Sequence, residues 1–271
     1  MPSMACSGLN IETSLQAAIW FVSQYGIAAV MVIHLDLKKI LISAIGILIF
    51  YWGLLWIGGS GDPYGLENNL IRRIDIFILG EKHLYGGTGI QFDPEGLLST
   101  IPSVVTVLIG YLVGAMLHTT KDFLDNIKRM SIFGGILIIL GLLWGFIFPI
   151  NKQLWTSSYV LFTGGIATLV LAFLSWMVDI KKLGKPLWVF KVFGTNSILL
   201  FVLSGLWTKT ILRISYVLNE TEVSGYSYLY KNLFVPIAGD LNGSLLFALS
   251  HVLGFWLILY WLYRKKIFIN L

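Results

Sequence analysis

Residues 83–114, HLYGGTGIQFDPEGLLSTIPSVVTVLIGYLVG, join a polar, glycine-rich loop directly to a long apolar run. Asp93 is a natural N-cap, Pro94 suits the first helical position, and Glu95 would face the positive end of the helix dipole. The pattern predicts a helix over 94–117, which at about 1.5 Å per residue is long enough to cross a membrane.

Pro102 falls inside this predicted helix, where it removes a backbone donor and should free a carbonyl near Leu98. The hydroxyls of Ser99, Thr100 and Ser103 lie beside it in the sequence. Because lipid cannot solvate unpaired backbone groups, such a break is tolerated only where protein or a water-filled cavity faces it. The segment is therefore interpreted either as the wall of a site or as a kink satisfied by its own hydroxyls.

The composition is that of a membrane protein, since the 271 residues are 56% hydrophobic, 14% aromatic and only 12% charged. A soluble domain carries about 25% charged residues. A hydropathy window of about 19 residues predicts an all-α, polytopic transmembrane protein with about seven spans. The predicted spans are 15–34, 40–57, 95–117, 130–149, 157–178, 187–207 and 244–263.

Basic residues are concentrated in the short connections and the C-terminal tail, whereas the long loops 58–94 and 208–243 hold fewer for their length. The positive-inside rule therefore predicts a cytoplasmic C-terminus and extracytoplasmic long loops. The short connections predicted to be cytoplasmic are 35–39, 118–129 and 179–186. An odd number of spans then leaves the N-terminus outside with nothing to export it. Residues 1–271 are therefore interpreted as a single transmembrane domain that forms the C-terminal part of a larger fold.

Several classes of function lack support in the sequence. The net charge of +5 is spread over loops, and no basic tract is long enough to indicate nucleic-acid binding. Cys6 is the only cysteine, which excludes an internal disulfide and a cysteine-based metal site. The histidines lack ligand spacing, so no metal site is predicted. His251, in the last predicted span, is either a functional ionisable group or a hydrogen-bonded packing residue.

Two polar segments are candidate ligand sites. In 149–159, Trp155 and Tyr159 can stack on a sugar ring, while Asn151 or Ser157 can meet its hydroxyls. The same aromatic residues would equally suit the interfacial belt of any membrane protein.

The second polar segment is 194–197, inside the sixth predicted span. Asn196 in hydrocarbon should face a partner helix or a cavity. Its neighbours Gly194 and Ser197 would let a partner helix approach closely, so helix packing and a cavity both remain open.

Four blocks of sequence, taken together, resemble one known family. They are DPEGLLSTIPS at 93–103, PINKQLWTSSYVL at 149–161, GTNSILLFV at 194–202 and LYRKKIF at 262–268, with HLYGG at 83–87 before the first. In this order they resemble heparan-α-glucosaminide N-acetyltransferase and its bacterial relatives. Any one of the blocks alone would be unspecific.

The resemblance implies a multi-pass acetyltransferase that takes acetyl groups from cytoplasmic acetyl-CoA and delivers them to the amine of a glucosamine-type sugar on the other face. It implies an amino-sugar or glycan acceptor and a lipid bilayer, most simply a bacterial inner membrane, as partners, and leaves a homodimer open. The implied sugar-binding residues are Asp93 and Glu95 at the mouth of the site, Asn151, Trp155, Ser157 and Tyr159 at the entrance, and Asn196 and Ser197 at a central cavity.

The sequence departs from the family pattern before its first predicted span. Members of the family begin with a span opened by an Asp-x-x-Arg-Gly-like motif, followed by an outer loop with the histidine that handles the acetyl group. Neither feature is found here, so no catalytic residue is assigned. The chain is expected to lack the N-terminal third of the fold and to be inactive without it. The alternative is a non-catalytic transporter or partner subunit that retains the sugar-binding cavity.

Overall fold

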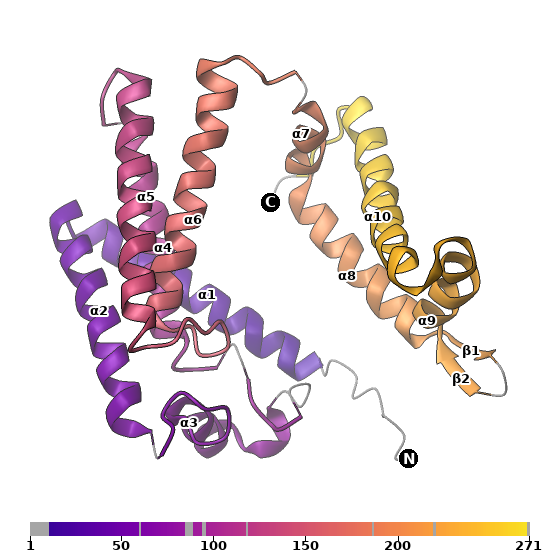
Figure 1. Cartoon of the computed structure of the whole chain (residues 1–271), viewed down its shortest axis with the longest axis horizontal. Helices are drawn as coiled ribbons and strands as arrows, with labels where there is room; N and C mark the ends of the chain where they lie inside the picture. The colour runs from indigo at the N-terminus through magenta and orange to yellow at the C-terminus, as the bar shows by residue number, and fades with distance from the viewer. Residues whose placement is uncertain are drawn as a thin grey trace. The chain divides into compact units, whose positions relative to one another are not determined.

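The computed structural model describes residues 11–59, 61–84, 89–93, 96–117, 119–185, 187–218 and 221–269. These residues form two compact units, Met1–Lys181 and Lys182–Leu271, which we describe separately. Nearly all described secondary structure is helical, which confirms the predicted all-α class (Figure 1). The prediction that 1–271 is a single domain stays a prediction.

The first unit contains the helices α1 to α6. Their bounds are α1 Ile11–His34, α2 Leu37–Gly58, α3 Leu70–Leu79, α4 Thr100–Met116, α5 Phe123–Gly145 and α6 Ser157–Ser175. A 3-10 turn, Glu81–His83, follows α3, and a π-helical turn, Trp176–Ile180, extends α6. The helices α5 and α6 run side by side, and α4 packs against both (Figure 1).

The packing of α5 on α6 depends on small residues. A Cβ atom at Gly165 would come within 2.6 Å of the Gly134 carbonyl oxygen, and one at Gly141 within 2.7 Å of the Phe162 nitrogen. Small residues are what permits such close approach of two helices in a membrane, where apolar side chains gain little from leaving lipid.

The helix α4 begins at Thr100, six residues later than the predicted start, so the prediction that Asp93 caps it is wrong. The first turn is tightened by hydrogen bonds from the Thr100 nitrogen to the Leu97 carbonyl and from the Ile101 nitrogen to the Leu98 carbonyl. Pro102 therefore lies in the first helical turn, where its missing N–H would have had no intrahelical partner. The predicted break inside a span, and the predicted kink, are both wrong for this reason.

The second unit contains a broken helix pair, a hairpin and a long helix. Its helices are α7 Trp188–Thr195, α8 Ser197–Arg213, α9 Gly225–Leu229 and α10 Val235–Arg264, with a π-helical turn at Tyr230–Phe234. The antiparallel strands β1 Ser215–Leu218 and β2 Thr221–Ser224 pair Ser215 with Ser224. They lie beyond the end of α8, next to α9 (Figure 1). The sequence analysis had treated this region only as a loop.

The apolar helices agree with a multi-pass membrane protein. Four helical segments are long and apolar enough to cross a membrane: Leu37–Gly58, Phe123–Gly145, Ser157–Ile180 and Gly225–Arg264. The pair α7 and α8 passes the same criterion but is bent by 76°, so the sixth predicted span is not one straight helix. Val22–His34 and Thr100–Met116 are shorter apolar helices. Helices thus occur at all of the predicted spans.

Candidate functional site

The aromatic loop before α6 is organised by Thr156, the N-cap of that helix. Its hydroxyl donates to the Pro149 carbonyl at 2.9 Å and accepts from the Asn151 nitrogen at 3.0 Å. It also accepts from the Tyr159 nitrogen at 3.4 Å, which caps the first turn of α6. These contacts fix the loop that contains Trp155, whose backbone is held in the left-handed region at φ 49°.

Trp155 and Tyr159 line a groove between α4 and α6. Their rings meet edge to face with centroids 5.4 Å apart, and the Trp155 indole nitrogen donates to the Thr106 hydroxyl at 3.3 Å. The groove has a volume of about 390 Å³, and its lining also includes Thr163 and Thr168 along α6. An apolar wall with a few hydroxyls is the chemistry that suits a sugar ring.

The side chains of Asn151 and Ser157 form hydrogen bonds with backbone groups of the protein. The Asn151 side-chain oxygen accepts from the Gln153 nitrogen at 2.8 Å, which forms a local turn. Ser157 is fully buried, and its hydroxyl donates to the Leu48 carbonyl on α2 at 2.8 Å. Ser157 therefore joins α6 to α2 and does not line the groove with Trp155 and Tyr159.

Asp93 lies near a second buried carboxyl group, that of Asp75 on α3. Asp75 is 0% exposed and Asp93 is 7% exposed. One Asp75 oxygen, Oδ1, accepts a hydrogen bond from the Leu97 nitrogen at 3.1 Å. The pKa of Asp75 is raised from its ordinary value of 3.8 to about 6: burial raises it most, the hydrogen bond from the Leu97 N–H lowers it, and the negative charge of Asp93 raises it. Glu95, the other predicted acid, lies outside the described residues.

Asp75 was missed by the sequence analysis, although a signal was present. In LIRRIDIFIL, residues 70–79, Asp75 is four residues after the fully buried Ile71, so both lie on the same buried face of α3. A lone acid on the apolar face of a helix is rare unless it has a partner or a function. That signal would have added Asp75 to the candidates.

Arg72, also on α3, binds the segment that leads to Asp93. The Arg72 guanidinium donates from Nε to the Gln91 carbonyl at 2.9 Å and lies 3.8 Å from the Glu81 carboxylate. Asn69 caps the helix by accepting from the Arg72 nitrogen at 2.8 Å. The helix therefore determines where both buried carboxyl groups lie.

A buried contact connects the carboxyl pair with the aromatic loop. Tyr51 on α2 is fully buried and donates its hydroxyl proton to the Leu154 carbonyl at 2.6 Å, one residue before Trp155. Tyr51, Ile71 and Leu154 belong to one apolar cluster with Leu55, Phe92, Leu98 and Phe148. Trp155 itself packs against the neighbouring apolar cluster, so the Tyr51–Leu154 contact is what links the loop to the core beside the carboxyl pair.

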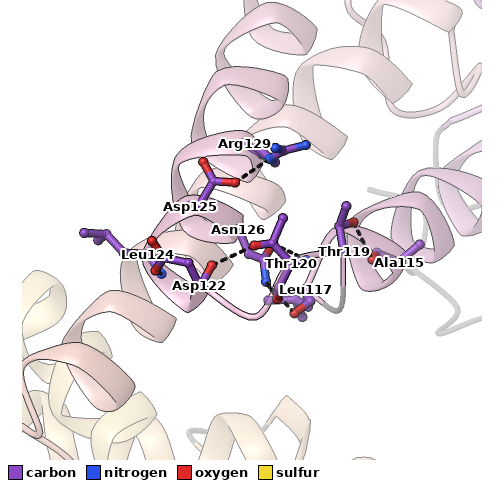
Figure 2. Close-up of polar contacts among 9 residues, drawn as sticks. All are labelled: Ala115, Leu117, Thr119, Thr120, Asp122, Leu124, Asp125, Asn126 and Arg129. Atoms are coloured by element: carbon purple, nitrogen blue, oxygen red, sulfur yellow. Dashed lines mark hydrogen bonds and ion pairs between the residues drawn. The ribbon is translucent and has the colours of Figure 1, made fainter.

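The connection from α4 to α5 is ordered by the side chain of Asn126, which is 1% exposed (Figure 2). Its Nδ2 donates to the Leu117 carbonyl at 3.0 Å and to the Thr120 carbonyl at 2.9 Å, while its Oδ1 accepts from the Thr120 hydroxyl at 2.8 Å. Asp122 caps α5 through the Leu124 nitrogen at 2.9 Å. This connection, predicted to be cytoplasmic, is therefore a defined turn and not a loose linker.

In the second unit, Asn196 occupies the break between α7 and α8 and is 1% exposed. Its Nδ2 donates to the Ile267 carbonyl at 3.1 Å, and its Oδ1 accepts from the Ile269 nitrogen at 2.8 Å. Asn196 thus fastens the C-terminal segment to the bend. Ser197 is the exposed first residue of α8.

His251, on α10, has a fixed tautomer. Its Nδ1 lies 2.8 Å from the Phe247 carbonyl, so that nitrogen carries the proton. The ring lies among Trp207, Tyr226 and Phe247 and borders a cavity of about 350 Å³. The hydrogen bond accounts for one ring nitrogen, whereas Nε2 is buried and has no hydrogen-bond partner among the described residues, so the packing and the functional interpretation both stay predictions.

Fold and site together define an all-α, multi-pass membrane protein with a buried carboxyl pair and, between α4 and α6, an aromatic groove. No protein-family model matches the chain. Over 174 residues, 55% of the chain, it is 38% identical to 26% of the heparan-alpha-glucosaminide N-acetyltransferase of Mus musculus. Over 239 residues, 80% of the chain, it is 31% identical to 32% of the protein of the same name from Homo sapiens.

The chain belongs to the heparan-α-glucosaminide N-acetyltransferase family, a family of membrane acetyltransferases. This confirms the resemblance based on the four sequence blocks. The aligned regions correspond to about a quarter to a third of the length of these curated relatives.

Proposed function

We propose that the protein takes part in transferring an acetyl group from cytoplasmic acetyl-CoA to the amine of a glucosamine-type sugar on the extracytoplasmic face. The relatives' names specify N-acetyl transfer to a glucosaminide, which requires an acetyl donor and an amine acceptor. The observation that carries the proposal is the buried carboxyl pair Asp75 and Asp93, of which Asp93 begins a block that resembles the family. Carboxylates suit a cationic amino sugar, because opposite charges attract strongly where water is scarce.

On this proposal the sugar lies against the aromatic groove. Trp155 and Tyr159 would stack on its ring, with the Thr106 and Thr163 hydroxyls beside them. Asp93 and Glu95 would contact the sugar hydroxyls or its ammonium group. Of the remaining candidates, Asn151 would hold the loop, Ser157 would hold α6 against α2, and Asn196 would hold the bend at which Ser197 begins α8.

Acetyl transfer to an amine needs a base, dipoles for the developing oxyanion, and alignment of two reactants. The rigid core under Asp75 and the aromatic loop would supply alignment. We propose that the phosphates of acetyl-CoA meet the basic connections on the cytoplasmic side, where Lys121, Lys128 and Arg129 flank the ordered turn at Asn126. A bacterial inner membrane, in which acetyl-CoA lies on one side and glycans on the other, suits this division.

The test is acetyl transfer by the protein in lipid nanodiscs, with radiolabelled acetyl-CoA and glucosamine. We expect N-acetylglucosamine from the wild type, and at least tenfold less from Asp93→Ala and Glu95→Ala with each variant still in the nanodisc. Unchanged turnover in both variants would contradict the assignment of these two acids. Glucosamine binding without any transfer would instead favour the transporter or partner-subunit alternative. Size-exclusion chromatography with light scattering tests whether the protein is a homodimer.

A further inference from the structure

Only one of the two oxygen atoms of the Asp75 carboxyl group has a hydrogen-bond partner among the described residues. Its Oδ1 accepts the Leu97 N–H at 3.1 Å, whereas its Oδ2 is buried and has no hydrogen-bond partner in the described part of the chain. An unpaired buried oxygen of an acid costs more than an unpaired neutral group. Such a group in a native structure calls for a ligand or a functional reason.

No cation of the described residues neutralises Asp75, since none forms an ion pair with it. From the segment before α4 it faces the Asp93 carboxyl group, and from α2 it faces the Tyr51 hydroxyl. The Tyr51 proton is directed to the Leu154 carbonyl. Arg72, on the same helix, is directed to Gln91 and Glu81 instead. Within the part of the chain that the structure describes, Asp75 therefore has negative and neutral polar neighbours and lacks a positive one.

Gly96 has no side chain, and the Asp75 carboxylate occupies the space that a side chain at position 96 would fill. A Cβ atom at position 96 would overlap the Oδ2 atom, so only glycine fits here without moving Asp75. Gly96 is part of the DPEG segment that contains Asp93. The same short segment thus donates to one Asp75 oxygen through Leu97 and makes room for the other.

We infer that Asp75 binds the ammonium group of the acceptor sugar through Oδ2 and takes its proton, a role that rests on the acetyl transfer proposed above. The proton passes from the sugar nitrogen to Oδ2 and leaves a neutral amine. The amine lone pair then forms the N–C bond to the thioester carbonyl, and the C–S bond to coenzyme A breaks. The second proton lost by the nitrogen ends on the coenzyme A sulfur, and Asp75 returns its proton to water.

The environment of Asp75 suits this role. With a pKa of about 6 the group is mostly ionised at neutral pH and is a stronger base than an exposed aspartate. The negative charge of Asp93 favours both an incoming cation and the uptake of a proton. An ammonium group would give Oδ2 the donor that the described residues do not.

The test compares two sugars that differ in the charge of the nitrogen, glucosamine and N-acetylglucosamine, by calorimetric binding to the purified protein at neutral pH. We expect Asp75→Asn to weaken glucosamine binding about tenfold or more, because a charge-assisted contact is lost. Binding of the uncharged N-acetylglucosamine should stay within about twofold. Asp62→Asn is the matched control, an exposed acid whose side chain accepts from the Tyr64 nitrogen, and should change neither affinity.

Asn keeps the acceptor for the Leu97 N–H, so we expect Asp75→Asn to fold. If the variant does not fold, the wild type can be measured instead. Its affinity for glucosamine should fall as the pH drops through about 6, while its affinity for N-acetylglucosamine should not change with pH. An unchanged glucosamine affinity in Asp75→Asn, equal losses for both sugars, or a flat pH dependence would overturn the inference. If the wild type transfers acetyl groups but any of these results is obtained, the proposed acetyltransferase function is kept and only the role of Asp75 is rejected.

Discussion

The Tyr51 hydroxyl on α2 donates a 2.6 Å hydrogen bond to the carbonyl of Leu154, although the two residues lie far apart in the sequence. Both residues are almost fully buried. The bond fixes the loop that contains Trp155 to the helix beside Asp75, so it joins the two halves of the candidate site. A long-range contact of this kind positions a site better than a flexible loop does.

Tyr51→Phe removes this donor and leaves the Leu154 carbonyl buried without its partner. We expect the free energy of unfolding to fall by about 1–3 kcal/mol. Thermal unfolding in nanodiscs measures the change, with Tyr111→Phe, at an exposed position on α4, as the control. Equal stability of wild type and Tyr51→Phe would mean that water replaces the bond.

Gly165→Ala tests the close approach of α5 and α6. The new Cβ atom would lie 2.6 Å from the Gly134 carbonyl oxygen and 2.8 Å from the Ile138 nitrogen, and neither backbone atom can move alone. We expect a loss of roughly 1–3 kcal/mol in the same unfolding assay. Gly135→Ala, where nothing lies within 4 Å, should be neutral or slightly stabilising. Similar effects of both variants would contradict the packing described here.

The pH dependence of stability follows from the raised pKa of Asp75. The folded state holds this proton up to about pH 6, whereas the unfolded chain releases it near 3.8, so the folded state binds more protons between these values. The free energy of unfolding should therefore fall as the pH rises through this window, by roughly 3 kcal/mol. Asp75→Asn should remove this slope, as chemical unfolding at a series of pH values will show. A slope that persists in the variant would assign it to another group.

Trp155→Ala separates sugar stacking from membrane anchoring. If Trp155 stacks on the sugar, the affinity for glucosamine and for N-acetylglucosamine should fall about threefold to tenfold. Trp56→Ala, at a position 65% exposed on α2, removes an ordinary surface tryptophan and should leave both affinities unchanged. If Trp155 belongs only to the interfacial belt, the two variants should behave alike.

Hydropathy was sufficient to predict α2, α5, α6 and α10, because their apolar runs are long, whereas α3 and α9 lie in segments predicted to be loops. The start of α4 could not be predicted from local signals. The sequence DPEG favours a helix start at Asp93, but the Leu97 N–H is bonded to Asp75, a residue on another helix. Tertiary contact overrides the cap signal there.

The candidate site was predictable only in part, for the same reason. Trp155, Tyr159 and Asp93 were visible as polar or aromatic residues in the family-like blocks. Asp75 is a candidate because of its contacts with Gly96 and Asp93 in the folded structure, whereas residues 70–79 alone have the pattern of an ordinary helix. Likewise, the bend at Asn196 depends on Ile267 and Ile269 at the far end of the chain, which a span prediction does not consider.

The measurement that tests the account most directly is sided acetyl transfer in sealed proteoliposomes with a uniformly inserted protein. Radiolabelled acetyl-CoA is supplied on the face of the C-terminus, and glucosamine only on the opposite face. The account predicts N-acetylglucosamine on the glucosamine side, with at least tenfold less from Asp75→Asn than from Asp62→Asn. Product formed only when both substrates share one face, or none from the wild type in either arrangement, would contradict transfer across the membrane by this protein.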